Sequence, residues 1–267
     1  ALVAIGAFFL YRLTSKHNIR TKAHKDWSNW RDEVAVVTGG GSGIGADVVK
    51  RLASLGTRVA ILDLNEPREV KTSDLIRFYQ TDVTDIAAIQ KSRDAIHKDF
   101  GAVSILVNNA GVANAGGGIA EANPKRTALT IQVNLLAIFH VTHIFLPDML
   151  EKNHGHVVTV ASAASFAPLA RGVDYSVSKA GAMAFVEGLH HELATVYEKP
   201  GIHATCVHPG WVTTPMTAKM FKPECYKDFL TPGEVGKAIV DQIQAGASES
   251  IYLPASISYL RWLRILP

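Results

Sequence analysis

Cysteine is scarce in this chain, and no metal-binding pattern is present. The 267 residues include two cysteines, Cys206 and Cys225, which are too few for a disulfide framework and favour a reducing compartment. The eleven histidines fall into neither C-x-x-C nor H-E-x-x-H spacing, so we predict no metal site. The formal net charge of +3 is too small to indicate a nucleic-acid partner.

Charged residues are also few, at 19%, whereas hydrophobic residues make up 48% of the chain. This composition excludes a disordered chain and suffices for a large α/β core. From Glu33 onward, short β-branched runs alternate with longer stretches of helical spacing. The alternation predicts one domain, residues 31–253, built on a seven-stranded parallel sheet with helices on both faces.

The elements of this sheet can be placed on the sequence. The predicted strands are Val34–Val37, Val59–Leu62, Leu75–Tyr79, Ser104–Val107, Val157–Val160, His203–Val207 and Ser250–Leu253. The predicted helices are Gly45–Leu55, Thr84–Phe100, Lys125–Met149, Tyr175–Tyr197 and one that begins at the capping box Thr231-Pro-Gly-Glu234. The crossover from Leu64 to Asp74 is short, so we expect its helix to be reduced or missing.

Both ends of the chain are apolar and basic. Residues 1–30 combine the apolar run Ala1–Tyr11 with a basic stretch and two tryptophans, and residues 254–267 form an apolar tail with two arginines around Trp262. The run is shorter than the about 20 residues of a spanning helix, but its basic flank predicts a membrane-associating segment followed by a cytosolic domain. The tail has an interfacial pattern. Surface helices, a signal segment or a subunit contact are the alternatives.

A glycine-rich turn follows the first predicted strand. The segment Thr38-Gly39-Gly40-Gly41-Ser42-Gly43-Ile44-Gly45 leads into the first predicted helix. Small residues let a pyrophosphate approach the backbone N–H groups, and the helix dipole favours its negative charge. Such a segment can also be a plain tight turn, but its position between a strand and a helix favours a phosphate loop.

The nucleotide is predicted from Asp63, which ends the second predicted strand. A carboxylate at this position binds the adenosine ribose hydroxyls and repels a 2′-phosphate. No lysine or arginine lies between Thr38 and Gly45 to neutralise such a phosphate, so NAD is favoured over NADP. The alternative for Asp63 is a capping or turn carboxylate.

Tyr175 and Lys179 lie four residues apart on one face of a predicted helix. Ser162 closes a predicted strand and lies upstream of them. With the motifs above, this arrangement resembles the short-chain dehydrogenase/reductase family over about Asp32 to Leu253, and in particular its membrane-associated retinol and hydroxysteroid dehydrogenases and their fungal relatives. The resemblance implies a doubly wound Rossmann fold and hydride transfer between NAD(H) and a lipophilic alcohol or carbonyl.

The resemblance also implies the site residues. The catalytic residues would be Asn134, Ser162, Tyr175 and Lys179. The cofactor-binding residues would be Thr38, Gly39, Gly41, Ser42, Gly43, Ile44, Gly45, Asp63, Leu64, Asp82, Val83, Asn109, Ala110, Gly111, Tyr175, Lys179, Pro209, Gly210, Val212 and Thr214.

Each catalytic residue has an expected task. Tyr175 is expected to exchange a proton with the substrate, and Ser162 to hydrogen-bond the substrate oxygen. The resemblance implies that Lys179 holds the nicotinamide ribose and that Asn134 supports a water that relays the proton. We expect the Lys179 cation and the oxidised nicotinamide to hold the pKa of Tyr175 below its ordinary value of about 10.

The substrate is expected to be lipophilic because the segment Thr213–Leu230, which closes over the substrate in this family, contains methionines and aromatic residues. These side chains could instead fill the edge of the core. Ser165, Phe166 and Pro168 are expected near the substrate. The resemblance further implies a homodimer through the helices Lys125–Met149 and Tyr175–Tyr197, and an endoplasmic-reticulum membrane location.

Two other functions share part of this pattern. A sugar-nucleotide epimerase shares the tyrosine and lysine but usually has T-G-x-x-G-x-x-G, and Ser42 stands where its middle glycine would be. A catalytically silent, NAD-binding scaffold at a membrane has no need for Tyr175 and Lys179 together. Both features favour the dehydrogenase.

Overall fold

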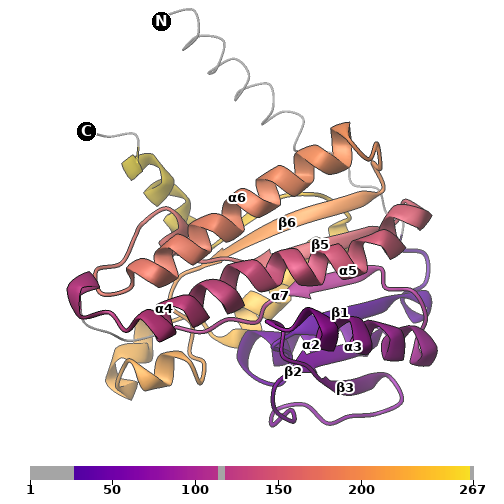
Figure 1. Cartoon of the computed structure of the whole chain (residues 1–267), viewed down its shortest axis with the longest axis horizontal. Coiled ribbons are helices and arrows are strands. Elements are labelled where there is room, and N and C mark those ends of the chain that lie inside the picture. Colours follow the sequence, from indigo (N-terminus) through magenta and orange to yellow (C-terminus); the bar gives the residue numbers. More distant parts are fainter. Residues whose placement is uncertain (1–26, 114–117, 265–267) are drawn as a thin grey trace, which may run out of the picture.

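Seven parallel strands form one sheet in the order β3-β2-β1-β4-β5-β6-β7 (Figure 1). The computed structural model describes residues 27–113 and 118–264, so the predictions for residues 1–26 and 265–267 lie outside the described residues. The strands are β1 (Val34–Thr38), β2 (Arg58–Asp63), β3 (Ile76–Gln80), β4 (Ile105–Asn108), β5 (Gly155–Val160), β6 (Ile202–Pro209) and β7 (Ser250–Leu253). The chain winds outward from β1 in both directions, which confirms the predicted doubly wound Rossmann fold.

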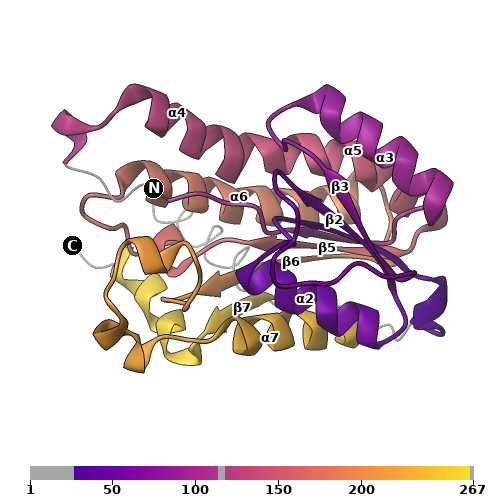
Figure 2. The ribbon, with the colours of Figure 1, turned by 90° about the horizontal axis from the view of Figure 1, so that it is seen from below.

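Helices cover both faces of the sheet (Figure 2). On one face lie α2 (Gly43–Ser54) and α7 (Pro232–Ala245), and on the other lie α3 (Ile86–Asp99), α4 (Pro124–Ile131), α5 (Ala137–Lys152) and α6 (Val173–Thr195). Alternate residues of β1 point to opposite faces. Val34 and Val36 therefore join the core under α3, α5 and α6, while Ala35 and Val37 join the core under α2 and α7. This two-sided burial is why the strands read as continuous apolar runs.

Side chains cap several helices at the positions that the sequence marks. Asp85 accepts hydrogen bonds at the start of α3, and Asn123 does so at the start of α4, where Pro124 is the first helical residue. The capping box of Thr231 and Glu234 is present at the start of α7. Each device satisfies N–H groups that the first helical turn leaves without a partner.

The single helix predicted over Lys125–Met149 is interrupted. Between α4 and α5 the chain forms a π-helical turn, Gln132–Leu136. Together these segments, Pro124–Lys152, make the one stretch among the described residues that is long and apolar enough to cross a membrane by length and composition. Half of its most apolar part is buried within the domain.

The crossover between β2 and β3 contains no helix, in agreement with its short length in the sequence. The chain instead passes as an irregular segment from Leu64 to Leu75, and Val70 is buried in the core under α2. We refer to Asn65–Val70 as the strap.

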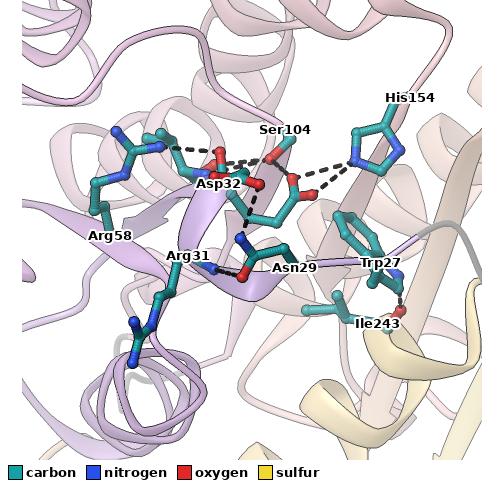
Figure 3. Close-up of polar contacts among 10 residues, drawn as sticks. Trp27, Asn29, Arg31, Asp32, Arg58, Ser104, His154 and Ile243 are labelled. Atoms are coloured by element: carbon teal, nitrogen blue, oxygen red, sulfur yellow. Dashed lines mark hydrogen bonds and ion pairs between the residues drawn. The ribbon is translucent and has the colours of Figure 1, made fainter.

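The start of the domain is fastened at the amino ends of the strands (Figure 3). The indole of Trp27 donates to the carbonyl of Ile243, in the last turn of α7, at 2.6 Å and stacks on Trp30. Nearby, the buried carboxylate of Glu33 accepts from Ser104 and lies 3.1 Å from Nε2 of His154. The predicted membrane-associating segment, residues 1–30, includes these two tryptophans, but both are half-buried and pack against the domain core.

Candidate active site

The predicted site residues gather at the carboxyl edge of the sheet. Thr38 ends β1, Asp63 ends β2, Asn108 ends β4 and Pro209 ends β6. Because all the strands are parallel, these ends lie along a single edge. Neighbouring strands β1 and β4 send their chains to opposite sides, and this reversal is where α/β sheets open a crevice for a ligand.

The glycine-rich loop has a geometry that only glycine allows at some positions. Gly39 and Gly43 have φ values of +63° and +56°, in the left-handed region. A Cβ atom on Gly45 would lie 2.3 Å from the carbonyl oxygen of Gly39. The loop and the start of α2 are therefore packed closely enough to present backbone N–H groups to a phosphate, so these residues fit a dinucleotide.

The turns after β1 and β4 are joined by hydrogen bonds. The hydroxyl of Thr38 accepts from the backbone N–H groups of Asn109 and Ala110, both at 3.0 Å. The side chain of Asn109 donates to the carbonyls of Thr38 and Gly39 at 3.0 and 3.1 Å. Two segments that were predicted to bind the cofactor, and that are distant in the sequence, thus form one continuous surface at the carboxyl edge of the sheet.

Asp63 lies beside the same loop. Its Oδ2 atom accepts from the N–H of Gly41 at 3.1 Å, and its Oδ1 atom accepts from the N–H of Asn65 at 3.3 Å. The next residue, Leu64, is exposed. The carboxylate is thus placed against the glycine-rich loop, where the sequence predicts the adenosine ribose.

Asp82 and Val83 follow β3 at the same edge. Asp82 accepts from the N–H and hydroxyl of Thr84 at 2.8 and 2.7 Å, so its carboxylate holds the turn before α3. Val83 is 7% exposed and belongs to the core.

The segment after β6 reaches the glycine-rich loop from the other side. The N–H of Gly210 donates to Leu253 at 2.7 Å, and Val212 is buried. A Cβ atom on Gly43 would lie 3.2 Å from Cγ2 of Thr214. Pro209, Gly210, Val212 and Thr214 are thus brought to the predicted cofactor edge.

Tyr175 and Lys179 lie on α6, as predicted. The side chain of Tyr175 is half-buried and hydrogen-bonded to that of Ser162, which follows β5. The Nζ atom of Lys179 is 5.8 Å from the centroid of the Tyr175 ring and donates to the carbonyl of Val160 at 2.8 Å. The three predicted catalytic side chains therefore meet between α6 and the end of β5.

Asn134 lies in the π-helical turn and is fully buried. Its Oδ1 atom accepts from the N–H of Val112 at 2.7 Å, while its Nδ2 atom donates to the carbonyl of Val112 at 2.9 Å and to Ser178 at 3.1 Å. A Cβ atom on Gly111 would lie 3.4 Å from Asn134 and 3.6 Å from Nζ of Lys179. Asn134 and Lys179 thus border the same glycine.

The ionisation of the site differs from the expectation for Tyr175. Burial raises the pKa of the Tyr175 phenol, and the hydrogen bond with Ser162 offsets this only in part. Lys179 by itself therefore does not lower the pKa of Tyr175 as expected, and the lowering by the oxidised nicotinamide stays a prediction. Lys179 is 4% exposed, and burial lowers its own pKa to about 8, which weakens it as a source of positive charge.

An aromatic cluster joins Trp211 to the segment Thr213–Leu230, which was expected to close over the substrate. Phe221 contacts the ring of Trp211 edge-on with centroids 4.6 Å apart, and Phe229 stacks on Trp211 at 5.9 Å. Tyr226 packs on Phe229 at 5.4 Å. Phe221, Tyr226 and Phe229 are half-buried, so they do not fill the core, and Trp211 is 41% exposed.

The prediction that Ser165 and Phe166 lie at the substrate is wrong. Both are buried in the domain, whereas Pro168 is exposed. The hydroxyl of Ser165 donates to the carbonyl of Lys179 at 2.9 Å, so it holds α6 in place. Phe166 packs against His208, whose ring stacks on Tyr252.

Three residues at this edge were missed. Trp211 lies between the predicted cofactor residues Gly210 and Val212 but was given no role, and the position of His208, two residues before Gly210, gave no signal by itself. The third is Glu69, whose Oε2 atom accepts from the N–H of Gly43 at 3.1 Å. The loop therefore holds a carboxylate at the first N–H group of α2.

Fold and site together define a Rossmann-type oxidoreductase. The sequence profile of the short chain dehydrogenases matches residues 33–224. The chain belongs to this family, whose members bind a nicotinamide cofactor, and the resemblance seen in the sequence is confirmed.

Curated relatives agree with this assignment. Dehydrogenase RED2 of Cochliobolus heterostrophus is 38% identical over 207 residues, which cover 77% of this chain and 78% of the relative. Human estradiol 17-beta-dehydrogenase 11 is 34% identical over 243 residues, which cover 88% of this chain and 79% of the relative.

Solved structures share the fold. The aldohexose dehydrogenase of Thermoplasma acidophilum has a TM-score of 0.74 at 23% identity, covering 84% of this chain and 92% of the other. The 3-ketoacyl-(acyl-carrier-protein) reductase of Brucella melitensis, complexed with NADH, has a TM-score of 0.73 at 23% identity, covering 82% and 96%.

Proposed function

We propose that this chain is an NAD-dependent dehydrogenase that transfers a hydride between NAD(H) and a lipophilic alcohol or carbonyl. The observation that carries the proposal is the hydrogen-bonded pair of Ser162 and Tyr175 at the carboxyl edge of the sheet, with Lys179 one helical turn away. The nicotinamide, when bound, supplies or accepts the hydride.

The proton is moved by Tyr175. In alcohol oxidation its phenolic oxygen takes the hydroxyl proton as the hydride leaves, and in carbonyl reduction the phenol returns that proton. Ser162 hydrogen-bonds the substrate oxygen and keeps it beside the phenol. Because burial favours the protonated phenol in the chain alone, Tyr175 is ready to act as the acid of carbonyl reduction.

Lys179 and Asn134 support this proton transfer. The ammonium of Lys179 holds the nicotinamide ribose while it remains tied to Val160. Asn134 supports the water that relays the proton. Its buried amide already makes three hydrogen bonds to the protein, which keep the π-helical turn, α6 and the turn at Val112 in a fixed arrangement.

NAD is the proposed cofactor rather than NADP. The support is the carboxylate of Asp63 at the glycine-rich loop, together with the lack of a basic side chain between Thr38 and Gly45. A 2′-phosphate at this position would meet a negative charge with no cation in the loop to compensate it.

The proposed substrate class rests on the aromatic cluster of Trp211, Phe221, Tyr226 and Phe229. Half-buried rings offer apolar surface to a ligand without belonging to the core. The name of the relative estradiol 17-beta-dehydrogenase 11 points to the same kind of ligand, a secondary alcohol on an apolar skeleton.

We also propose a homodimer and a membrane location. Apolar side chains are exposed along α4 to α6, at Leu129, Leu136, Phe139, Val173 and Val177, and they form a face for a second subunit. The apolar and basic residues 1–26, which precede the core-packed Trp27, and residues 254–267 would hold the domain at the cytosolic side of the endoplasmic-reticulum membrane. Unchanged partitioning into liposomes after removal of residues 1–25 and 257–267 would count against the membrane location.

The central test compares the wild type with Tyr175→Phe. NADH binding is measured by fluorescence, and turnover is then measured with a steroid, a retinoid and a long-chain alcohol and with the matching carbonyls. We expect the variant to bind NADH as the wild type does and to lose at least about 100-fold in turnover. NADH binding by the wild type without turnover of any alcohol or carbonyl would favour the silent scaffold.

A further inference from the structure

The strap between β2 and β3 lies on the glycine-rich loop. The N–H groups of Arg68 and Glu69 donate to the carbonyl of Gly41 at 3.2 and 3.4 Å. A Cβ atom on Gly41 would lie 3.2 Å from Cα of Pro67, so the two backbones are in close contact. The strap therefore covers the part of the loop that faces Asp63.

Glu69 extends this contact to the start of α2. Its Oε2 atom accepts from the N–H of Gly43 at 3.1 Å, at the positive end of the helix dipole. Ser42, the residue that precedes α2, makes no side-chain hydrogen bond there. The carboxylate of Glu69 thus occupies an N–H group that a phosphate would use.

The two anions cannot share this donor. A dinucleotide phosphate placed at Gly43 would meet the charge of Glu69 within hydrogen-bonding distance, where like charges repel strongly. Glu69 itself is exposed, whereas Val70 is 6% exposed and fixed in the core. The strap can therefore turn its acidic part toward solvent while Val70 stays in place.

We propose that Glu69 sets the affinity for the dinucleotide by competing with its phosphate for the N–H of Gly43. This inference rests on the proposed function, since it concerns the cofactor site assigned above. In the chain alone the strap is closed, and cofactor binding requires the carboxylate to leave the loop.

The test measures the dissociation constant of NADH for the wild type, Glu69→Gln and Glu66→Gln by fluorescence titration. Glu66 lies in the same strap and is exposed, and among the described residues it has no hydrogen bond to the glycine-rich loop, so its substitution removes the same charge without the hydrogen bond. We expect Glu69→Gln to bind NADH about tenfold more tightly than the wild type, because a neutral acceptor competes less well than a charged one. We expect Glu66→Gln to stay within about twofold of the wild type.

The titrations separate the competition at Gly43 from the assignment of the cofactor site. Tighter binding by Glu69→Gln alone supports the competition. Equal or weaker binding by Glu69→Gln, with a wild type that binds NADH, overturns the competition and leaves the cofactor assignment intact. Binding by none of the three proteins overturns the proposed cofactor site and this inference with it.

Amide hydrogen exchange gives a second, independent readout on the wild type. Saturating NAD⁺ should slow exchange at Gly43, which gains a phosphate, and should speed exchange at Arg68 and Glu69, which lose the carbonyl of Gly41. Slower exchange at all three positions would mean that the strap stays closed over the bound dinucleotide, and would overturn the proposal.

Discussion

The ammonium of Lys179 donates to the carbonyl of Val160 at 2.8 Å and lies 5.8 Å from the centre of the Tyr175 ring. The lysine is thus fixed to the end of β5, and α6 is fixed with it. This single bond holds a buried cation beside a phenol whose pKa is raised by burial. Lys179 is thereby placed for its proposed role, but burying its positive charge lowers the free energy of unfolding.

The cost can be measured with Lys179→Met. The pKa of Lys179 is about 8 in the folded chain and 10.5 when exposed, so the unfolded chain binds more protons between these values and the wild type gains stability as the pH rises through them. The destabilisation is fully present below pH 8. We therefore expect Lys179→Met to be inactive and, at pH 7, as stable as the wild type or more stable by about 1–3 kcal/mol.

Urea unfolding of both proteins at pH 7 and pH 9.5 checks this. The difference in unfolding free energy should shrink at the higher pH. If the difference in unfolding free energy is the same at pH 7 and pH 9.5, burial of the Lys179 charge does not destabilise the folded chain.

The buried His156 predicts a loss of stability in acid. His156 is fully buried next to His203, with ring centroids 5.7 Å apart, and burial lowers the pKa of His156 to about 3. The unfolded chain takes up a proton near pH 6.5 but the folded chain does not, so this stability is present above pH 6.5 and is lost as the pH falls toward 3. Between pH 7 and pH 4.5 the wild type should lose about 2 kcal/mol more than His156→Asn.

Thermal or urea unfolding of the two proteins at both pH values gives the comparison. His156→Asn keeps a group that can hydrogen-bond to Thr205, which the histidine does at 2.8 Å, but it has no charge to acquire. Parallel losses in the two proteins would assign the acid sensitivity to other groups.

Cofactor preference should change with Asp63→Asn. Removing the carboxylate at the glycine-rich loop removes its repulsion of a 2′-phosphate, so the ratio of kcat/KM for NADP to that for NAD should rise at least about tenfold. Asp74→Asn is the matched control, because Asp74 is an exposed acid in the same crossover and its loss changes the net charge equally. If the ratio rises equally in both variants, the change in net charge explains the preference and Asp63 has no specific role at the 2′-position.

The dimer should depend on Phe139, which is 50% exposed on α5 and packs edge-on against Phe185 of α6 at 4.7 Å. A charge at this apolar position would be buried without a partner in the proposed interface. We expect Phe139→Glu to sediment as a monomer and Ile86→Glu, which alters an exposed apolar residue of α3, to sediment as the wild type. If Phe139→Glu still sediments as a dimer, the subunit interface does not include Phe139 and lies on another surface.

The sheet could be predicted from sequence because its strands are short apolar runs buried on both faces. The seven predicted strands agree with the structure to within two residues at each end, as β6 shows by extending to Pro209. The interruption at Gln132–Leu136 could not be predicted, since a π-helical turn has no composition of its own and is fixed by the contacts of Asn134 with Val112 and Ser178.

At the site, spacing gave the positions of Ser162, Tyr175 and Lys179 but not their ionisation. The pKa of a phenol depends on how much water surrounds it, and that follows from packing rather than from distance along a helix. Glu69 was missed for a related reason, since a short crossover leaves open where its side chains go. Its contact with Gly43 depends on Val70 entering the core.

The fastening of Trp27 to Ile243 has a consequence for how this molecule is built. The attachment lies at the amino ends of the strands, across the sheet from the reacting groups. Any peptide that precedes Trp27 therefore joins the domain at the end remote from the chemistry. If that peptide binds a membrane as proposed, membrane attachment and the proposed chemistry occupy opposite ends of the sheet, and either could be exchanged, in evolution or in the laboratory, while the other is kept.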